Sequence, residues 1–171
     1  MTQYRIAGLV AALILVMMLG APALAETLHA SLDGFQEAPL TLSTTGRGEF
    51  RAKISEDETQ IEFELSYQDL EADVLFAHIH LGRPAIAGGV IAFLCGGGTK
   101  PACPGPREGT VTGTISASDI IGPTGQGIAA GEFVEVLEAI RERATYANVH
   151  STLYPGGEIR GAIRRGKGGK D

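Results

Sequence analysis

Cysteine and histidine are scarce in this chain, and the short motifs of common enzyme classes are missing. Among 171 residues there are two cysteines and four histidines. No G-x-S-x-G, Walker A or Rossmann glycine pattern occurs, and the glycine-rich segment 96–100 lacks the spacing of a phosphate loop. These absences remove the usual sequence support for a serine hydrolase, a nucleotide-binding protein or a dinucleotide-dependent oxidoreductase. We therefore lean toward a domain that is not an enzyme.

Positive charge is also in short supply. The chain has 14 Lys and Arg residues against 20 Asp and Glu residues, for a formal net charge of −6. This balance argues against nucleic acid or an anionic membrane surface as a partner. The one basic run lies at the end of the chain, where residues 165–171 are also rich in glycine. We interpret them as a disordered tail.

A long hydrophobic run occurs only near the N-terminus. Arg5 precedes an apolar stretch over residues 6–19, and Ala23-Leu24-Ala25 follows as a small-x-small cleavage site. This order predicts a signal peptide over residues 1–25. The run is short for a membrane span and no second one follows, so we expect no stable span after cleavage. The expected product is a periplasmic or secreted protein with one domain over residues 26–164.

The two cysteines, Cys95 and Cys103, lie eight positions apart. In an exported protein this spacing predicts one disulfide that closes a loop. A metal-binding pair and two free thiols are the weaker alternatives, because neither the spacing nor the neighbouring residues match a zinc motif.

Apolar and polar residues alternate along most of the chain after residue 26. In the segment 61–67, for example, every second side chain is apolar. This period indicates half-buried antiparallel strands. About eight such segments lie near residues 27–35, 47–54, 60–67, 73–81, 89–95, 109–116, 145–152 and 158–164. The pattern predicts an all-β protein, a Greek-key-like antiparallel β-sandwich of about eight strands.

One segment departs from this alternation. Between about residues 131 and 143, Phe133, Leu137 and Ile140 recur at helical spacing, with charged residues between them. We expect one amphipathic helix packed on the sandwich.

Two of the histidines, His78 and His80, share one strand. The intervening and flanking residues form an apolar row that is expected to face the core: Leu75, Ala77, Ile79 and Leu81. Both histidines must then point outward, with Cα atoms about 6.6 Å apart. By the same parity His150 points outward from the strand near 145–152. These three imidazoles lie in strands that could adjoin.

Three outward imidazoles predict a surface metal site, most compatible with copper or zinc. Four further residues are candidates for contacts around the ligands: Glu37, Tyr146, Glu158 and Arg160. The alternative is that the histidines only brace adjoining strands through hydrogen bonds, without a metal. The fourth histidine, His29, is interpreted as a surface residue.

The turn before the last strand contains Pro155-Gly156-Gly157. A three-residue connection that ends in a glycine with positive φ keeps both strands in phase. It places Thr152 opposite Arg160.

Several blocks of the sequence together resemble the CHRD domain, a module named from chordin and common in exported bacterial proteins. The blocks are LDGFQEAP at 32–39, AHIHLG at 77–82, GTVTGTISASDI at 109–120 and YANVHSTLYPGGEIRGAI at 146–163. The resemblance extends from about Leu28 to Ile163. It implies an extracytoplasmic all-β domain for binding or scaffolding and supplies no reaction.

A looser likeness concerns the copper-zinc superoxide dismutase sandwich, in which an HVH strand and a later VH supply copper ligands. His78, His80 and His150 stand in a similar order, but no histidine lies between His80 and His150 to bridge to a zinc site. Three hypotheses remain. We favour a non-enzymatic binding module with a copper or zinc site over a purely structural or protein-interaction domain that binds an extracytoplasmic protein partner. The third is a superoxide-dismutase-like copper enzyme.

Overall fold

The computed structural model describes residues 26–166. The predicted signal peptide, residues 1–25, lies outside the described residues, and so do residues 167–171 of the predicted tail. The described part of the chain forms nine strands, one α-helix and three short 3₁₀ helices.

The strands follow the predicted segments closely. They are β1 (Thr27–Asp33), β2 (Arg47–Ile54), β3 (Gln60–Gln68), β4 (Val74–Leu81), β5 (Gly89–Cys95), β6 (Gly109–Ser116), β7 (Thr145–Ser151), β8 (Ile159–Ala162) and β9 (Arg164–Arg165). The helix α1 spans Phe133–Arg141, and the 3₁₀ helices are η1 (Gly34–Gln36), η2 (Ala117–Asp119) and η3 (Thr124–Gln126). The two-residue strand β9 was not predicted as a separate strand, and it includes Arg165, the first residue of the predicted tail.

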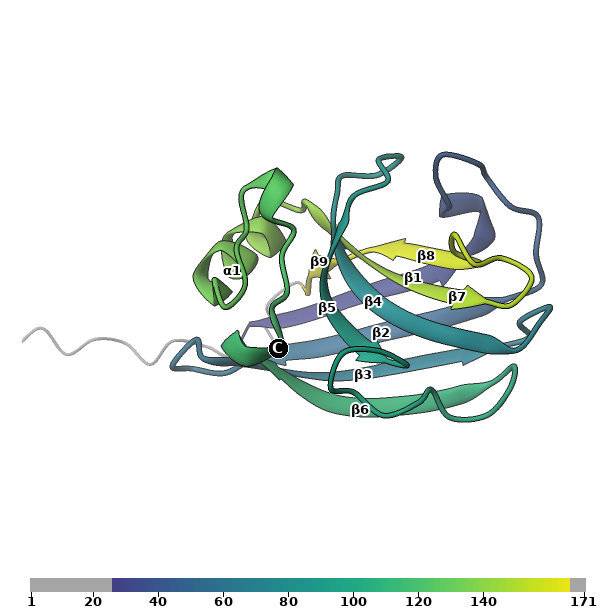
Figure 1. Ribbon diagram of the computed structural model, residues 1–171, viewed down its shortest axis with the longest axis horizontal. Coiled ribbons are helices and arrows are strands. Elements are labelled where there is room, and N and C mark those ends of the chain that lie inside the picture. The colour runs from purple at the N-terminus through teal and green to yellow at the C-terminus, as the bar shows by residue number, and fades with distance from the viewer. Residues whose placement is uncertain (1–25, 167–171) are drawn as a thin grey trace, which may run out of the picture.

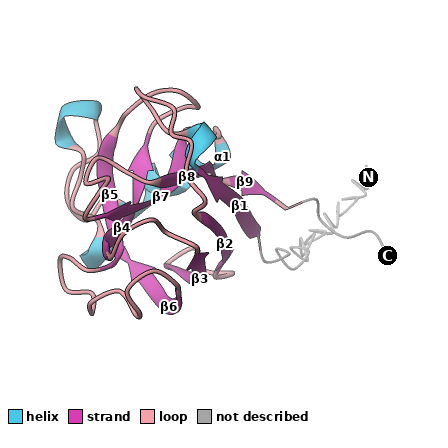
Figure 2. Cartoon of the chain, turned by 90° about the vertical axis from the view of Figure 1, so that its right-hand side faces the viewer, coloured by secondary structure: helices cyan, strands magenta, loops and turns pink. Residues whose placement is uncertain are grey.

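All strand pairs are antiparallel, in the order β5-β4-β7-β8-β1-β2-β3-β6, with β9 beside β1. The sheet folds into two layers, with β4, β5 and β7 in front of β1, β2 and β3, and β6 runs along the lower side between them (Figure 1). The edge strands β5 and β6 approach each other, so the sheet is nearly closed, as the turned view also shows (Figure 2). The all-β prediction with a single helix is confirmed.

The core lies between the two layers and is built by alternation. On β2 and β3, Phe50 faces Leu65 and Ile54 faces Ile61, and all four side chains are buried. Each large apolar side chain buried in this way contributes about 1.5–3 kcal/mol. Helix α1 buries Phe133 and three further residues and closes one end of the sandwich (Figure 1).

One core prediction on β4 is wrong. Ala77 and Ile79 are fully buried, but Leu75 is 36% exposed. The register of β4 against β7 shifts between Val74 and Phe76, so Leu75 is the extra residue of a bulge. Strict alternation in the sequence cannot reveal such an insertion.

The predicted register of β7 and β8 is also wrong, by four positions. Arg160 lies opposite Asn148, not Thr152. The ladder ends where Glu158 N donates to Val149 O, and Thr152 N instead donates to Asp73 O, so the connection is longer than predicted. Because the error is an even number, the outward and inward faces are unchanged. Gly157 does have a positive φ, of 128°.

The disulfide between Cys95 and Cys103 is present, as predicted, and closes the loop that follows β5. Neither cysteine is therefore free to bind a metal. Within residues 26–166, no helix has both the length and the apolar character needed to cross a membrane.

Candidate metal centre

Adjacent strands bring the three outward histidines together. β4 pairs with β7, so that Phe76 lies opposite His150 and His78 lies opposite Asn148. The candidate ligand atoms of His78, His80 and His150 all lie within 4.8 Å of one another. The expectation that the two strands adjoin is confirmed, and the three rings point away from the core between the layers.

The site is nevertheless buried, so the prediction of a surface site is wrong. His78, His80 and His150 are only 4%, 8% and 5% exposed. Two connections contribute to their cover: residues 82–88 between β4 and β5, and residues 152–158 between β7 and β8 (Figure 1). Strand parity predicts the side on which a residue lies, but not which loops pack over that side.

Backbone carbonyls fix the orientation of two of the rings. His80 Nδ1 lies 2.9 Å from Gly88 O, and His150 Nδ1 lies 3.0 Å from Pro155 O. A carbonyl oxygen can only accept, so both Nδ1 atoms carry the proton. In the neutral rings, both Nε2 atoms are then unprotonated and carry a lone pair, which is the form that binds metals.

The third ring completes the cluster. His78 Nδ1 lies 2.9 Å from His80 Nε2. Because His80 Nε2 can only accept, His78 Nδ1 donates this hydrogen bond. His150 Nε2 is buried and hydrogen-bonds to no protein atom among the described residues. Such a buried polar atom costs about 1–3 kcal/mol unless a partner compensates.

Burial holds the three rings neutral. It lowers the pKa of His78 to about 3 and that of His150 to about 4, with smaller contributions from the neighbouring rings. Burial is also the largest cause of the lowered pKa of His80, to which the positive charge of Arg160 adds. At neutral pH, therefore, protons do not compete for the lone pairs.

Aromatic side chains surround the cluster. The Phe76 ring lies 4.9 Å from the His78 ring and 4.8 Å from the His150 ring, between centroids. Phe93 meets His78 edge-on at 4.8 Å, and Tyr146 stacks in parallel on His80 at 4.7 Å. Phe76 shares the parity of the two β4 histidines and was therefore predictable. Phe93 was not, because β5 shifts register twice against β4.

Arg160 supports the cluster indirectly. Its guanidinium carbon lies 3.5 Å from the centroid of the Tyr146 ring. The same group donates to Arg83 O at 3.0 Å and to Ile86 O at 2.8 Å. Gly88 N donates to the Tyr146 hydroxyl at 3.1 Å. Arg160 and Tyr146 together therefore hold the loop that presents Gly88 O to His80.

The two carboxylates predicted near the ligands hold other groups instead. Glu37 accepts from Asn148 Nδ2 at 2.6 Å, and burial raises the pKa of Glu37 to about 7. Glu158 is fully buried and accepts from Thr44 Oγ1 at 2.8 Å and from Glu71 N at 2.7 Å. Of the four residues predicted around the ligands, only Tyr146 therefore packs directly on one of the rings.

The family model of the CHRD domain matches residues 28–163, which include all three clustered histidines. The chain belongs to the CHRD family. Comparison with curated proteins and with solved structures gives no match. The family suggests a binding module, and the geometry of the histidine cluster must carry any more specific conclusion.

The surface of this CHRD domain offers no comparable cluster of histidines within the described residues. His29 is exposed on β1 opposite Arg51.

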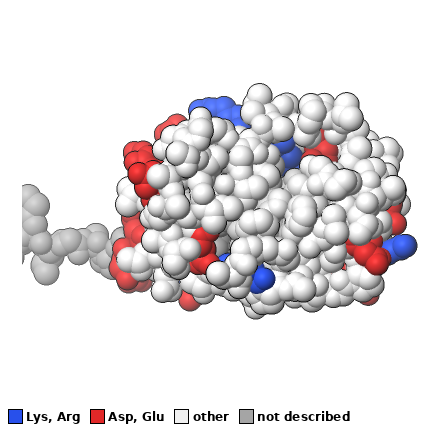
Figure 3. All heavy atoms as spheres, viewed as in Figure 1, with Lys and Arg blue, Asp and Glu red and all other residues white. Residues whose placement is uncertain are grey.

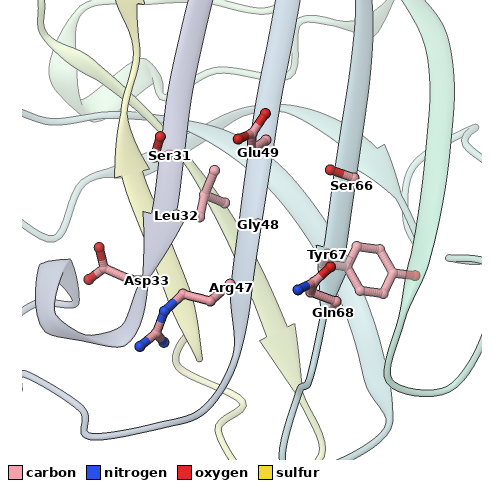
Figure 4. A pocket seen from close by; sticks show the side chains of 9 residues that line it. All are labelled: Ser31, Leu32, Asp33, Arg47, Gly48, Glu49, Ser66, Tyr67 and Gln68. Atoms are coloured by element: carbon pink, nitrogen blue, oxygen red, sulfur yellow. The ribbon is translucent and has the colours of Figure 1, made fainter.

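A hollow of about 360 Å³ lies over β1, β2 and β3, where Ser31, Glu49 and Ser66 stand in register (Figure 4). No histidine lines it. On the face seen in Figure 3, lysine and arginine form no continuous area.

The CHRD-domain cluster fits a copper or zinc ion. Imidazole nitrogens bind such ions at about 2.0–2.1 Å, so two ligands of one ion lie at most about 4.2 Å apart. The candidate ligand atoms, which lie within 4.8 Å of one another, must therefore draw together by about 0.6 Å or more, and the hydrogen bond between His78 Nδ1 and His80 Nε2 must give way to the ion. Three imidazoles without a carboxylate or thiolate suit copper or zinc and do not suit calcium or magnesium.

Proposed function

We propose that this CHRD-domain protein is a non-enzymatic binding module that holds one copper or zinc ion through His78, His80 and His150. The proposal rests on one observation above the others. His150 Nε2 is buried, is oriented as an acceptor by the bond from His150 Nδ1 to Pro155 O, and has no protein partner among the described residues. A metal ion would supply that partner.

The purely structural alternative accounts for two of the three rings. The hydrogen bond between His78 and His80 satisfies both facing nitrogens without a metal. It does not account for His150, whose Nε2 has no partner within residues 26–166. The His150 ring belongs to the same cluster, with its centroid 4.5 Å from that of the His78 ring. A strand brace would be served as well by an apolar residue at position 150, which would leave no buried acceptor.

A superoxide-dismutase-like enzyme is the secondary hypothesis. Within residues 26–166 the fourth histidine, His29, lies on the exposed face of β1 and does not join the cluster. A bridged two-metal site is therefore not supported, and we assign no catalytic residue.

We further propose that the protein is exported to the periplasm or secreted. The signal-peptide pattern over residues 1–25 supports this, and so does the Cys95–Cys103 disulfide, which is typical of oxidising compartments. N-terminal sequencing of the protein recovered from its native cells tests the proposal. We expect the chain to begin at Glu26, and an intact Met1 would contradict export by this route.

Metal titration tests the binding site. The purified protein is titrated with Zn²⁺ and with copper, followed by calorimetry and by metal analysis after gel filtration. We expect one ion per chain and loss of binding in the His78→Ala/His80→Ala double variant, with circular dichroism to show that the variant is folded. His29→Ala is the matched control and should bind as the wild type does. Equal binding by the double variant, or none by the wild type, would reject the site and favour a protein partner.

A further inference from the structure

We infer that this site selects monovalent copper, Cu(I), over divalent copper and zinc. The inference rests on the proposed function, because it concerns the ion that the three histidines hold. It follows from the charge of the ligands, the charge around them and the number of donors.

The ligand set carries no negative charge. All three donors are neutral imidazoles, and the two cysteines are bonded to each other. A divalent ion would therefore keep its full charge of +2 in the site, whereas Cu(I) would bring only +1. Since the cost of transferring an ion from water into a less polar interior rises with the square of its charge, the divalent ion meets about four times the penalty.

The surroundings add to this difference. Phe76, Phe93 and Tyr146 pack against the rings and provide no anionic group. The cation of Arg160 lies on the Tyr146 ring, whose other face stacks on His80, since β8 and β4 flank β7 on opposite sides. Repulsion from this fixed positive charge is twice as large for a divalent ion.

The two buried carboxylates that were predicted near the ligands do not contact them. Glu37 is engaged by Asn148, and Glu158 is engaged by Thr44 and by the Glu71 amide. Neither hydrogen-bonds to a candidate ligand among the described contacts. No carboxylate therefore joins the ligand cluster, and the charged group that stacks on Tyr146 beside His80 is the cation of Arg160.

The number of donors points the same way. The described residues supply three clustered ligand atoms from His, Cys, Asp or Glu. Cu(I) is stable with three ligands, whereas Cu(II) prefers a tetragonal set and zinc a tetrahedral one. A divalent ion would need a further ligand, and aromatic rings occupy much of the surroundings of this buried cluster.

Relative affinities test the inference. The dissociation constants of the purified wild type for Cu(I), Cu(II) and Zn²⁺ are measured by competition with chromophoric chelators, without oxygen for Cu(I). We expect Cu(I) to bind at least tenfold more tightly than either divalent ion. For the Cu(II)/Cu(I) couple, a tenfold preference for Cu(I) places the reduction potential of the bound ion about 59 mV above that of the aqueous ion. A smaller ratio would overturn the inference and leave the proposed site intact. Failure of all three ions to bind would overturn the site itself.

A matched pair of variants isolates the charge of Arg160. Arg160→Gln and Arg160→Lys both weaken the contacts to Arg83 O and Ile86 O, but only Arg160→Lys keeps the positive charge. We expect the ratio of Cu(I) to Cu(II) affinity to fall severalfold in Arg160→Gln and to change little in Arg160→Lys. Equal ratios in the two variants would show that this charge does not contribute to the selection. If neither variant folds, the wild-type ratios still decide.

Discussion

The outer faces of β3 and β7 begin from the same kind of sequence and end in different environments. On β3, the outward residues Glu62 and Glu64 are exposed to solvent. On β7, all seven residues are buried, including the outward Tyr146, Asn148 and His150. Alternation therefore assigns a side chain to a face, whereas the connections that fold over that face decide whether it meets water. Polar residues on a face that loops cover are candidates for a site.

The largest expected effect is a loss of stability in acid, and it comes from the buried histidines. The pKa values of His78 and His150 are lowered to about 3 and about 4 in the folded protein, against about 6.5 in the unfolded chain. The unfolded state therefore takes up more protons below pH 6.5, and the stability of the metal-free protein falls as the pH decreases. From pH 7 to pH 5 we expect the two histidines to lower the free energy of unfolding by about 4 kcal/mol. The raised pKa of Glu37, about 7 in the folded protein, acts in the opposite direction and offsets about 2 kcal/mol of this loss.

Urea denaturation of the metal-free protein at several pH values checks this expectation. A His78→Leu variant should show a shallower decrease, whatever its stability at pH 7, because one of the two rings no longer takes part. An equal slope in the two proteins would mean that the His78 ring is protonated in the folded state.

A smaller difference is expected when one glutamate is removed from the connection that follows β7 and one from the exposed face of β3. Glu158→Ala leaves the buried Thr44 hydroxyl and the Glu71 amide without their acceptor, so it should lower the free energy of unfolding by about 2 kcal/mol. Glu62→Ala, on the exposed face of β3, should change it by no more than about 0.5 kcal/mol. Denaturant unfolding at pH 7 measures both. Similar losses would break the distinction between the two faces.

The smallest effect concerns a single hydroxyl group. Tyr146→Phe keeps the ring that stacks on His80 but removes the acceptor for Gly88 N. We expect metal affinity to fall by less than tenfold, because the hydrogen bond between His80 and Gly88 O remains. Tyr154→Phe is the control, since the Tyr154 hydroxyl donates to Glu71 away from the cluster. A loss of binding in Tyr146→Phe would mean that this hydroxyl has a direct role at the ion.

Much of the fold was predictable because strand formation here follows a local pattern. The boundaries of β2, β5 and β6 coincide with the predicted segments, and α1 lies within the predicted helix. The bulge at Leu75 was not predictable, since it depends on the pairing of β4 with β7. The register of β7 and β8 was missed for a similar reason, because Thr152 bonds to Asp73 and so continues the ladder with β4 instead of pairing with β8.

The candidate site was predictable only in part. Parity grouped the three histidines, and the family resemblance placed them in one domain. The two carbonyls that orient His80 and His150 belong to Gly88 and Pro155, and backbone oxygens leave no trace in a sequence. The buried setting was missed because it arises from loop packing. Contacts that side-chain identity encodes were therefore within reach, and contacts that the path of the backbone creates were not.

The two carbonyls also belong to two different connections. Gly88 lies between β4 and β5, and Pro155 lies between β7 and β8, so their histidines link both loops to one small volume. An ion held there would restrain the two loops together. When the ion binds, hydrogen exchange of the backbone amides should therefore slow in both loops together. Proteolysis should likewise slow in both loops, not in one alone.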